Sequence, residues 1–524
     1  MSVRHRILVM MPILAVFTLN IDAETIPNLA TRIVPNRYIV VYRDATVPGD
    51  AETRTRSVGA HLLHHHDRLG IATVELNQQS GTSPASARAI KPSDDHEIIQ
   101  RLASQPNVEY VLHDRIVTAH RLQVRAVPAD KMAPVFSVAT SMPAFDTYYN
   151  SPQGWAVRQA GGYSNSVPGG PVSGPWDTTT GKGVRIAILD SGVDTSHPDI
   201  APNLALNLSE VDQSVLPSMC DDGSPRDQAG HGTWTASLAA AALGPGTGRV
   251  VGVAPSASIL NIKVLERVPA AISGGTDTAR CSAGESSGLL SWVIQGIDDA
   301  ISNHADVISM SLGTTIDLTT GDGAGVKAAF DRVTYAATQA GAVLVAAAGN
   351  DGYNLVNPRY IEIPAQAQSV LAVVASTNPD CMENTRSGAF CIAGPPSLAY
   401  YSNYGAPLNA LAAPGGSYPS GGDTAISGWV RGACSSGLPN TQDGLPNDLA
   451  HSFGCFNLGH TAYVQAIGTS AAAPLVAGAA ALLRAAHPEW DSVTVVTALK
   501  TAATPATSLL PAPQINLPSS LSYR

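Results

Sequence analysis

A single hydroxyl in a stretch of small residues gives the first indication of chemistry. The segment AIGTSAAAPLVAG runs from Ala466 to Gly478 and sets Ser470 between a Gly-Thr pair and a series of alanines. One interpretation is a helix N-terminus, in which Thr469 or Ser470 caps the helix and the alanines extend it. The other is a nucleophile whose neighbours are small so that a substrate carbonyl can approach it. Unlike a cap, a nucleophile needs a base, a group that orients the base and an oxyanion donor elsewhere in the chain.

Three further residues have the side-chain types that such a nucleophile needs. Asp190 directly follows the apolar run VRIAIL, His231 lies between two glycines ahead of a small-residue stretch, and Asn350 ends the run AVLVAAAGN. Taken alone, each has an ordinary alternative: a turn aspartate, a helix-start histidine and a turn asparagine. Together with Ser470 they provide an orienting carboxylate, a base, an amide donor for an oxyanion and a nucleophile.

Alternating apolar runs and helical segments predict the elements that hold these residues. Buried strands are predicted at 184–189, 258–265, 305–312, 342–348 and 369–375, and helices at 286–305, at 325–341 and from Ser470 onward. Continuous apolar strands separated by helices are typical of a parallel sheet that helices cover on both faces. We therefore predict an α/β domain over 151–524, with a mostly parallel central sheet whose strand ends carry the candidate residues.

The N-terminus has the layout of a secretory signal peptide. Arg4 and Arg6 precede an apolar run from Ile7 to Leu19, and Ala23 provides a small residue at the cleavage point. The apolar run is too short to span a bilayer comfortably, and we identify no other stretch that is long and apolar enough. We expect residues 1–23 to be removed and the mature protein to be secreted, with no membrane partner.

Residues 37–120 predict a separate small α+β unit. RYIVVYRD (37–44) has the pattern of a strand, and the stretch 96–114 has that of a helix, a turn and a strand. From 121 to about 150 the chain contains several prolines and no hydrophobic period, as in VRAVPADKMAPVFSVATSMP. Such a segment is typical of a linker and is a natural site for proteolysis.

The composition excludes several classes of protein. Hydrophobic residues make up 44% and charged residues 14% of the 524 residues, which argues against a disordered chain. The formal net charge of −10, without a run of Lys or Arg, argues against a nucleic-acid partner. No Cys or His spacing favours zinc, since His96-Glu97 is not followed by the second histidine ligand.

The six cysteines fit the oxidising surroundings of a secreted protein. Six cysteines allow fifteen pairings, and the sequence alone does not choose among them. Short loops favour two pairs and leave a third: Cys381 with Cys391, Cys434 with Cys455, and Cys220 with Cys281.

Four motifs in order resemble those of the subtilisin-like serine proteases, or subtilases. They are DSGVDTSHPD from 190, GHGTWTAS from 230, AAAGND from 346 and GTSAAAPLVAG from 468. The order Asp, His, Ser along the chain is the one found in subtilisin. The resemblance extends from Trp155 to about Ala506 and includes VGVAPSASILNIKVL and LLSWVIQGIDDAISNHADVISMSLG.

This resemblance implies a secreted serine endopeptidase that needs no cofactor for catalysis. Ser470 would attack the peptide carbonyl, His231 would take its proton, and Asp190 would orient the imidazole. Asn350 and the Ser470 N–H would hold the oxyanion. Substrate protein or peptide would bind as an extended strand, to a segment and a pocket floor formed by Ser311, Leu312, Gly313 and Gly349.

The N-terminal unit resembles the inhibitory prodomain of this family over 37–113. That resemblance implies a zymogen that removes its own prodomain: residues 24–120 would form the prodomain, 121–150 the linker with the processing site, and 151–524 the catalytic domain. The prodomain would be the enzyme's inhibitory partner, and we expect the mature enzyme to be a monomer.

Two residues depart from the family pattern beside the candidate site. Trp234 follows His-Gly-Thr, and we interpret it as packing under the helix, with a role in shaping the substrate cleft as the alternative. Ala471 stands after the serine where methionine is common in the family. Without a thioether there, we expect the enzyme to resist inactivation by dilute peroxide, and rapid loss of activity with intact disulfides would contradict this.

Structural calcium is the one metal that the resemblance suggests. Asp199 matches a calcium-ligand position, but the loop GPGTGRVVG (244–252) lacks the Asn and Asp oxygens that usually complete such a site. The acidic loops at 220–227 and 316–324 are expected to be solvated, with calcium binding as the alternative. Asp221 and Asp222 precede His231 closely, so they also suggest a preference for basic side chains in the substrate.

Three alternatives remain open at this point. Gly284 to Gly288 matches the G-x-S-x-G motif of α/β-hydrolase esterases, which requires a strand before the serine and a helix after it. A catalytically inactive subtilase fold that acts as a binding module is the non-enzymatic alternative. In the N-terminal unit, the cluster His61, His64, His65 and His66 predicts a solvated helix face, or else a metal site or a pH trigger for prodomain release.

Overall fold

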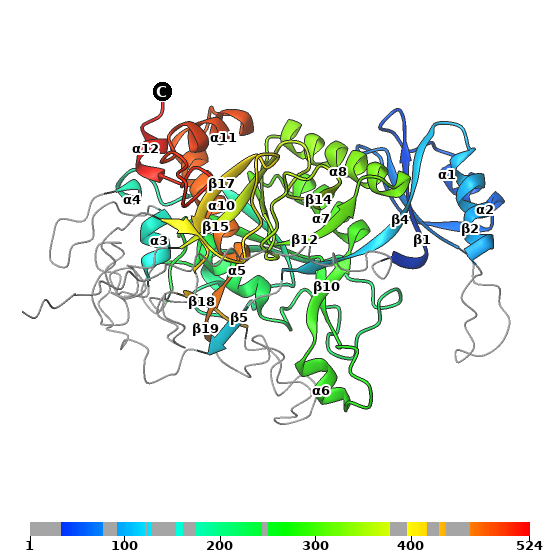
Figure 1. The fold of residues 1–524 in the computed structure, drawn as a ribbon, viewed down its shortest axis with the longest axis horizontal. Helices are drawn as coiled ribbons and strands as arrows, with labels where there is room; N and C mark the ends of the chain where they lie inside the picture. Colours follow the sequence, from blue (N-terminus) through cyan, green and yellow to red (C-terminus); the bar gives the residue numbers. More distant parts are fainter. Residues whose placement is uncertain are drawn as a thin grey trace, which may run out of the picture.

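Two folded units lie against each other in the computed structural model of the chain (Figure 1). The structure describes residues 33–76, 92–120, 123–126, 154–160, 174–243, 250–377, 396–416, 429–435 and 462–524. The small unit (blue in Figure 1) ends at residue 119, and the large unit begins at Trp155. The predicted signal peptide and most of the predicted linker lie outside the described residues.

A parallel sheet forms the centre of the large unit, as predicted. Its strand order is β16-β15-β13-β11-β6-β8-β7, and β17 pairs with β15. All pairings are parallel except β15 with the short β16. The strands are β6 (Arg185–Asp190), β7 (Leu204–Ser209), β8 (Ser258–Lys263), β11 (Val307–Met310), β13 (Val343–Ala347), β15 (Val370–Thr377), β16 (Ser397–Leu398) and β17 (Ala410–Pro414).

Both faces of this sheet are buried, which explains why its strands are continuously apolar. Along β6, Ile186 and Ile188 belong to one core cluster, whereas Ala187 and Leu189 belong to the other. Successive side chains of a strand point to opposite faces, so each face receives every second residue. Helices α5 and α10 pack on the first face and α7 and α8 on the second: α5 (His231–Ala240), α7 (Leu290–Ser302), α8 (Gly321–Gln339) and α10 (Thr469–Ala486).

Helix α10 corrects one expectation from the sequence. By length and composition it is apolar enough to cross a membrane, with a mean hydropathy of 1.3. It lies inside the protein, however, against β11, β13 and β15 of the sheet, and its first fifteen residues are buried. Its apolar composition therefore fits the central helix of a packed core.

The small unit is an antiparallel sheet with its own core and two helices. The strand order is β4-β1-β3-β2, and Tyr38, Val40 and Val74 are among its buried residues. The histidine cluster lies on β2 and not on a helix, which corrects the prediction. The elements are β1 (Ile33–Tyr42), α1 (Ala51–Ser57), β2 (Ala60–His66), β3 (Ile71–Leu76), α2 (Pro92–Ala103) and β4 (Val108–Ala119).

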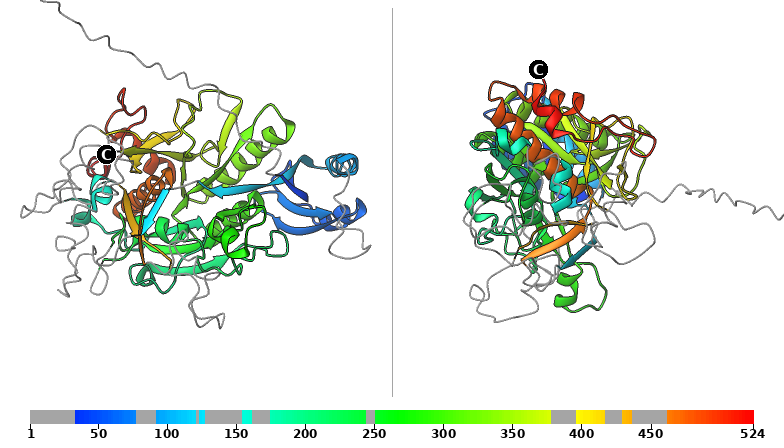
Figure 2. Two further views of the ribbon diagram at one scale, coloured as in Figure 1. Left: turned by 60° about the horizontal axis from the view of Figure 1, so that its bottom comes forward. Right: turned by 90° about the vertical axis from the view of Figure 1, so that its left-hand side faces the viewer.

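Strand β4 links the two units. Its first part pairs with β1, and its last residues pair with β10 (Glu285–Leu289) and β12 (Leu312–Asp317) of the large unit. The left view of Figure 2 shows the small unit (blue) on one side of the large one. The prediction of a helix from 286 was wrong at its start, because β10 occupies those residues and α7 begins at Leu290.

A second short strand follows β4 in the segment predicted to be an irregular linker. Strand β5 (Gln123–Ala126) pairs antiparallel with β19 (Tyr463–Ile467), which in turn pairs with β18 (Val430–Ala433). The remaining elements surround the sheet: β9 (Leu265–Val268), β14 (Tyr360–Ile363), α3 (Trp155–Ala160), α4 (Pro175–Thr178), α6 (Asp277–Ser282), α11 (Ser492–Thr501) and α12 (Leu517–Leu521).

Candidate active site

Asp190 and His231 form a buried pair at the carboxyl edge of the central sheet. Asp190 is the last residue of β6 and His231 the first of α5, and they are 0% and 2% exposed. The His231 Nδ1 lies 2.6 Å from the Asp190 Oδ1. Asp190 also accepts hydrogen bonds from the Ser191 N–H (2.7 Å) and the Thr235 hydroxyl (3.1 Å), so its carboxylate is fixed in place. A carboxylate at Nδ1 leaves Nε2 as the ring nitrogen that can exchange a proton with a substrate.

Asp227 shapes the turn that presents His231, and sequence reasoning missed this role. Its carboxylate is fully buried and accepts hydrogen bonds from the Gly230 N–H (2.7 Å), the Thr233 N–H (2.8 Å) and the Ser191 hydroxyl (2.9 Å). Burial raises the pKa of Asp227 to about 6, although these hydrogen bonds lower it. The sequence signal was weak, since an aspartate four residues before a histidine is also an ordinary turn residue.

Glycine is required where α5 meets the loop after β6. A Cβ at Gly232 would lie 2.1 Å from the Gly192 carbonyl oxygen, too close for any side chain. Gly230 has a φ of 97°, in the left-handed region that favours glycine. The glycines on either side of His231 therefore hold the helix start directly against β6.

Ser470 lies in the first turn of α10, fully buried and next to Ser311. The Ser470 hydroxyl donates to the Ser311 carbonyl at 3.4 Å, and the Ser311 hydroxyl donates to the Ser470 carbonyl at 3.2 Å. Ser311 directly follows β11, a neighbour of β6 in the sheet. The small residues after Ser470 are buried as well, because α10 packs closely against α5 and the sheet.

Asn350 is anchored through its amide oxygen. That oxygen accepts hydrogen bonds from the Thr469 N–H (2.8 Å) and the Thr469 hydroxyl (2.7 Å). Because a backbone N–H can only donate, this contact identifies the oxygen and leaves the Asn350 NH₂ group as the donor on the other side. The structure thus places an oriented amide donor beside the residue that precedes Ser470.

The end of β4 lies as an extended strand between β10 and β12, and the space between these two strands is called the cleft below. It runs antiparallel to β10, with Thr118 opposite Ser287 and Val117 opposite Gly288. On its other side Thr118 is opposite Gly313 of β12. A peptide segment of the chain itself is therefore held by backbone pairing on both sides. Leu312 and Gly313, which the sequence analysis assigned to substrate binding, pair with this segment.

Two acidic residues fix the small unit to the helices of the large unit. Asp114 caps α7, accepting hydrogen bonds from the Ser291 N–H (3.1 Å) and hydroxyl (2.5 Å), and it pairs with Arg37 at 3.0 Å. Asp322, in the first turn of α8, accepts a hydrogen bond from the His113 N–H (2.9 Å) and pairs with Arg115. Of the predicted histidine cluster, His66 is buried against Asp298 of α7 at 3.1 Å.

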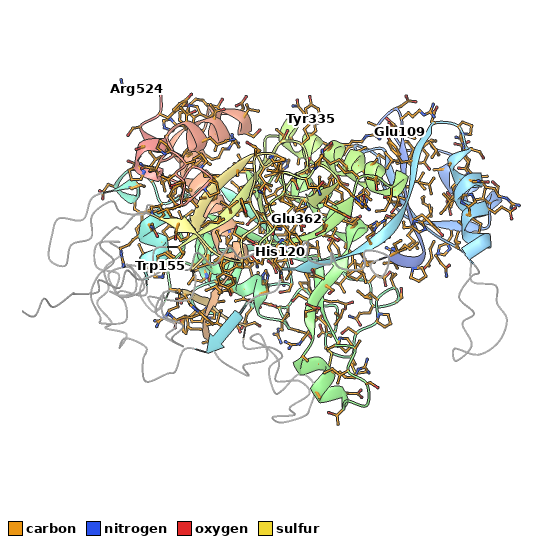
Figure 3. All side chains as sticks on the ribbon, in the orientation of Figure 1. Glu109, His120, Trp155, Tyr335, Glu362 and Arg524 are labelled. Atoms are coloured by element: carbon orange, nitrogen blue, oxygen red, sulfur yellow. A yellow bond between two sulfur atoms is a disulfide. The ribbon has the colours of Figure 1, made fainter. Side chains whose placement is uncertain are left out.

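His120 and Glu362 meet where the strand leaves the cleft (Figure 3). The His120 Nε2 lies 4.0 Å from the Glu362 Oε1, and both side chains are almost fully buried. A Cβ at Gly313 would come within 3 Å of both side chains, and a Cβ at Gly349 would lie 3.7 Å from the imidazole. The two predicted pocket glycines therefore border this contact. Glu362 was missed, because nothing in YIEIPAQ distinguishes it from a surface glutamate on an edge strand.

The calcium prediction finds no support among the described residues. Asp199 is buried, and its Oδ2 accepts a hydrogen bond from the Tyr463 hydroxyl at 2.8 Å. Within the part of the chain that the structure describes, no group of three or more His, Cys, Asp or Glu is placed to hold a metal ion. Six of the nine residues of the loop 244–252 lie outside that part.

The acidic loop before His231 has a structural role. Asp221 accepts hydrogen bonds from the Lys263 ammonium (2.7 Å) and the Arg267 N–H (2.9 Å) and is buried. Asp222 is engaged by the side chain of Gln228 and by the Ser224 N–H (2.9 Å). These contacts argue against the hypothesis that the two aspartates select basic substrates.

One disulfide prediction is confirmed. Cys220 and Cys281 are bonded, with their Cα atoms 5.4 Å apart. Cys434 is also disulfide-bonded, whereas Cys381, Cys391 and Cys455 lie outside the described residues, so the other two pairings stay predictions.

The two departures from the family pattern are both buried. The Trp234 ring approaches His231 edge-on, with the ring centroids 6.1 Å apart, and it packs under α5 against Gly432. This position fits the packing interpretation. Ala471 is fully buried directly after Ser470, and the expected resistance to peroxide stays a prediction.

The esterase motif does not form the turn that its chemistry needs. Ser286 lies inside β10, paired with Arg267 of β9, and α7 begins only after Leu289. A nucleophile of that enzyme class lies on a sharp turn between a strand and a helix. The structure therefore gives the esterase alternative no support.

Comparison with known proteins identifies the same region. The model of the subtilase family matches residues 181–515. Subtilisin NAT from Bacillus subtilis subsp. natto is 34% identical over 325 residues, which cover 62% of this chain and 61% of that protein. The chain thus spans about three fifths of the length of this curated relative.

Two solved structures share the fold. Fervidolysin from Fervidobacterium pennivorans, a keratinolytic enzyme related to subtilisin, aligns with a TM-score of 0.59 at 19% identity, covering 96% of this chain and 62% of its own. The epidermin leader peptide processing serine protease from Staphylococcus aureus also aligns with a TM-score of 0.59, at 18% identity, covering 93% of this chain and 97% of its own.

Proposed function

Because the chain belongs to the subtilase family, we propose that it is a secreted serine endopeptidase, made as a zymogen that processes itself. Protein or peptide substrates bind as extended strands, and no cofactor takes part in the chemistry. The observation that carries the proposal is the buried contact of 2.6 Å between Asp190 and His231. A carboxylate that fixes Nδ1 of an imidazole prepares its Nε2 to activate a hydroxyl nucleophile, and the helices that carry His231 and Ser470 pack against each other.

Acylation begins when substrate arrives beside Ser470. The Ser470 hydroxyl turns from the Ser311 carbonyl toward His231, whose Nε2 takes the proton as the Oγ–carbon bond forms. Catalytic hydrogen bonds of this kind often tighten only in the substrate complex. The protonated imidazole is stabilised by Asp190 and then gives its proton to the leaving amine as the carbon–nitrogen bond breaks.

The oxyanion that forms in this step needs donors that are already in place. The Asn350 NH₂ group and the Ser470 N–H fill this role, since the two hydrogen bonds from Thr469 to the amide oxygen fix the orientation of the amide and of its NH₂ donor. Water then attacks the acyl-enzyme, His231 takes one of its protons, and the carboxylic acid product leaves as that proton returns to Ser470. One water molecule is consumed for each peptide bond.

The position of β4 supports the zymogen proposal. Residues 117–119 occupy the cleft as a substrate would, and β5 pairs with β19, which ends three residues before Ser470. The chain on both sides of residues 121–122 is therefore paired with strands of the large unit, with β10 and β12 before them and with β19 after them. Arg37, Asp114 and Ser291 bind the rest of the small unit to the large one, so the cleft stays blocked until the two are separated.

The experiment is the intact mass of the secreted chain, compared with that of the Ser470→Ala variant. The expected result is that the wild-type chain loses its N-terminal unit between residues 120 and 152, whereas Ser470→Ala keeps it. The new N-terminus of the wild-type chain reports whether residues 1–23 and the small unit were removed in separate cuts. Equal processing of both chains would mean that another protease matures this one.

A serine-directed phosphonate separates the enzyme from an inactive binding module. The wild-type protein, freed of its N-terminal unit, is expected to be labelled at Ser470 and to lose activity in proportion. A fully folded protein that takes up no label and cleaves no added casein would contradict the proposed function.

A further inference from the structure

The side chain of His120 enters a slot that belongs to the cleft. The antiparallel register sets Ala119 opposite Leu312 and Thr118 opposite Gly313, so the next step places His120 opposite Ser311. Ser311 in turn exchanges hydrogen bonds with Ser470. His120 is therefore the residue of the bound strand whose carbonyl lies at the proposed nucleophile, and its side chain marks the pocket for the residue before the cleaved bond.

Two glycines open this slot. A Cβ at Gly313 would lie 2.9 Å from the His120 Cε1 and 2.3 Å from the Glu362 Oε1. A Cβ at Gly349 would lie 3.7 Å from the same imidazole carbon. A side chain at Gly313 would fill the space that His120 and Glu362 now share, so the missing side chain creates the pocket.

A fixed carboxylate closes the slot. Glu362 lies on β14, is 2% exposed, and faces Thr315 across the β12–β14 ladder. Its Oε2 accepts a hydrogen bond from the Thr315 hydroxyl at 3.0 Å, and its backbone N–H donates to the Gln366 side chain at 2.8 Å. One carboxylate oxygen is thus held by the strand, while the other, Oε1, lies 4.0 Å from the His120 Nε2.

We propose that Glu362 makes this enzyme select a cationic side chain (arginine, lysine or protonated histidine) directly before the bond that it cleaves, and that His120–Arg121 is its first such bond. The proposal rests on the proposed function. A carboxylate in a nearly dry pocket is costly unless a cation and hydrogen bonds compensate it. An apolar substrate side chain would bury the Glu362 charge against hydrocarbon. The pocket therefore rejects apolar side chains as well as attracting cationic ones. Lysine and arginine have longer side chains than histidine, so their cationic groups can close the gap of 4.0 Å that histidine leaves to the carboxylate.

The test compares peptides that copy the bound strand. Val-Thr-Ala-Xaa-p-nitroanilides with Arg, Lys, His, Leu or Phe at Xaa are cleaved by the mature enzyme and by its Glu362→Gln variant. We expect the wild type to cleave the Arg peptide with a kcat/KM about 100-fold above that of the Leu peptide. Glu362→Gln should lower kcat/KM for Arg about 30-fold or more and leave that for Leu unchanged or higher.

Matched variants separate the pocket from general effects of charge and folding. Glu362→Asp keeps the charge and should retain a preference for Arg over Leu, reduced by the shorter reach. Glu489→Gln removes an exposed carboxylate on the far side of α10 and should leave all ratios as in the wild type. Active-site titration with a phosphonate that carries Leu gives the amount of folded enzyme for each variant.

The two possible failures are distinguishable. An enzyme that titrates with the phosphonate but prefers Leu or Phe, or whose Arg-to-Leu ratio survives Glu362→Gln, overturns the role of Glu362 and leaves the protease standing. A folded wild-type protein that neither titrates nor cleaves any peptide contradicts the proposed function instead. If Glu362→Gln does not fold, the wild-type preference and the Glu362→Asp ratio decide.

Discussion

Two histidine–carboxylate pairs lie within the cleft, and they differ in tightness and origin. His231 and Asp190 are 2.6 Å apart and come from neighbouring elements of one rigid unit. His120 and Glu362 are 4.0 Å apart, and the histidine belongs to the segment bound in the cleft. Both carboxylates are anchored to the large unit, Asp190 by Thr235 and Glu362 by Thr315, whereas of the two histidines only His231 belongs to that unit.

The difference follows from what each pair has to do. A base must be held within a fraction of an ångström of its working position, so both members of the Asp190–His231 pair are fixed by the fold. A specificity pocket must accept a series of incoming side chains, so only the Glu362 carboxylate is fixed and its partner is replaceable. On our proposal, the tight pair serves the reaction, and the loose pair serves the choice of substrate.

Breaking the tight pair is expected to have the largest effect. Asp190→Asn keeps the size of the side chain but lets His231 adopt the wrong tautomer, so kcat on the Arg peptide should fall by about 10⁴-fold. Stopped assays at matched active-site concentration measure this loss. Glu362→Gln is the control at the loose pair, because its effect should depend on the peptide. A loss in Asp190→Asn that also depends on the peptide would mean that the two pairs are not separate in function.

Removing the oxyanion donor beside the tight pair comes next. Asn350→Ala deletes the amide that Thr469 orients, and kcat should fall by about 10²- to 10³-fold with KM nearly unchanged, because this hydrogen bond strengthens only in the transition state. Asn350→Asp is a second variant of similar size that replaces the donor by a negative charge and should lose at least as much. A change that appears mainly in KM would assign Asn350 to substrate binding instead.

The loose pair can be titrated through the substrate. For the mature enzyme, the ratio of kcat/KM for the His peptide to that for the Arg peptide should fall about tenfold per pH unit above about 6.5, where the substrate imidazole loses its proton. Glu362 is the charged group that faces this position, while Gly313 and Gly349 present only backbone. Any effect of pH on the free enzyme itself is common to both peptides and cancels in the ratio. A flat ratio from pH 5.5 to 8.5 would show that the charge on the side chain does not matter.

The sequence predicted the tight pair but not the loose one, for a physical reason. Asp190, His231, Asn350 and Ser470 each follow a strand or begin a helix, and the carboxyl ends of parallel strands meet at one edge, so the sheet alone brings them together. Glu362 belongs to an edge strand whose pairing with β12 depends on the three-dimensional fold. Its neighbour His120 lies more than 200 residues away in the chain. No local pattern encodes such a contact.

The same distinction explains the corrections to the fold. The apolar runs of the central strands were sufficient to predict that sheet. By contrast, the strands β5 and β10 were predicted as linker and helix, because their pairing partners are remote and their own sequences are polar or small. Asp227 likewise reads as a turn residue until the fold shows that it holds the backbone before His231.

Glu266 is a buried carboxylate outside both pairs. It shows the free-energy cost of burying a carboxylate whose surroundings compensate its charge poorly. Glu266 of β9 is fully buried near Asp221, and burial together with the Asp221 charge raises its pKa to about 8, although Lys263 lowers it. Between pH 4.5 and 8 the folded protein therefore holds a proton that the unfolded chain has released. Stability falls as the pH rises through this window.

The smallest expected effect is the removal of this proton dependence. The Glu266→Gln variant is made in the Ser470→Ala chain to prevent self-digestion. From pH 5 to pH 8.5 its melting temperature should fall by about 3–6 °C less than that of the Ser470→Ala parent. Differential scanning calorimetry across that range measures the difference. Glu285→Gln on the adjacent strand removes an exposed carboxylate and should follow the parent. If the melting temperatures of Glu266→Gln and its parent fall in parallel, Glu266 is already ionised in the folded protein. The fold would then tolerate a buried negative charge at Glu266, whereas in the cleft each buried carboxylate faces a histidine.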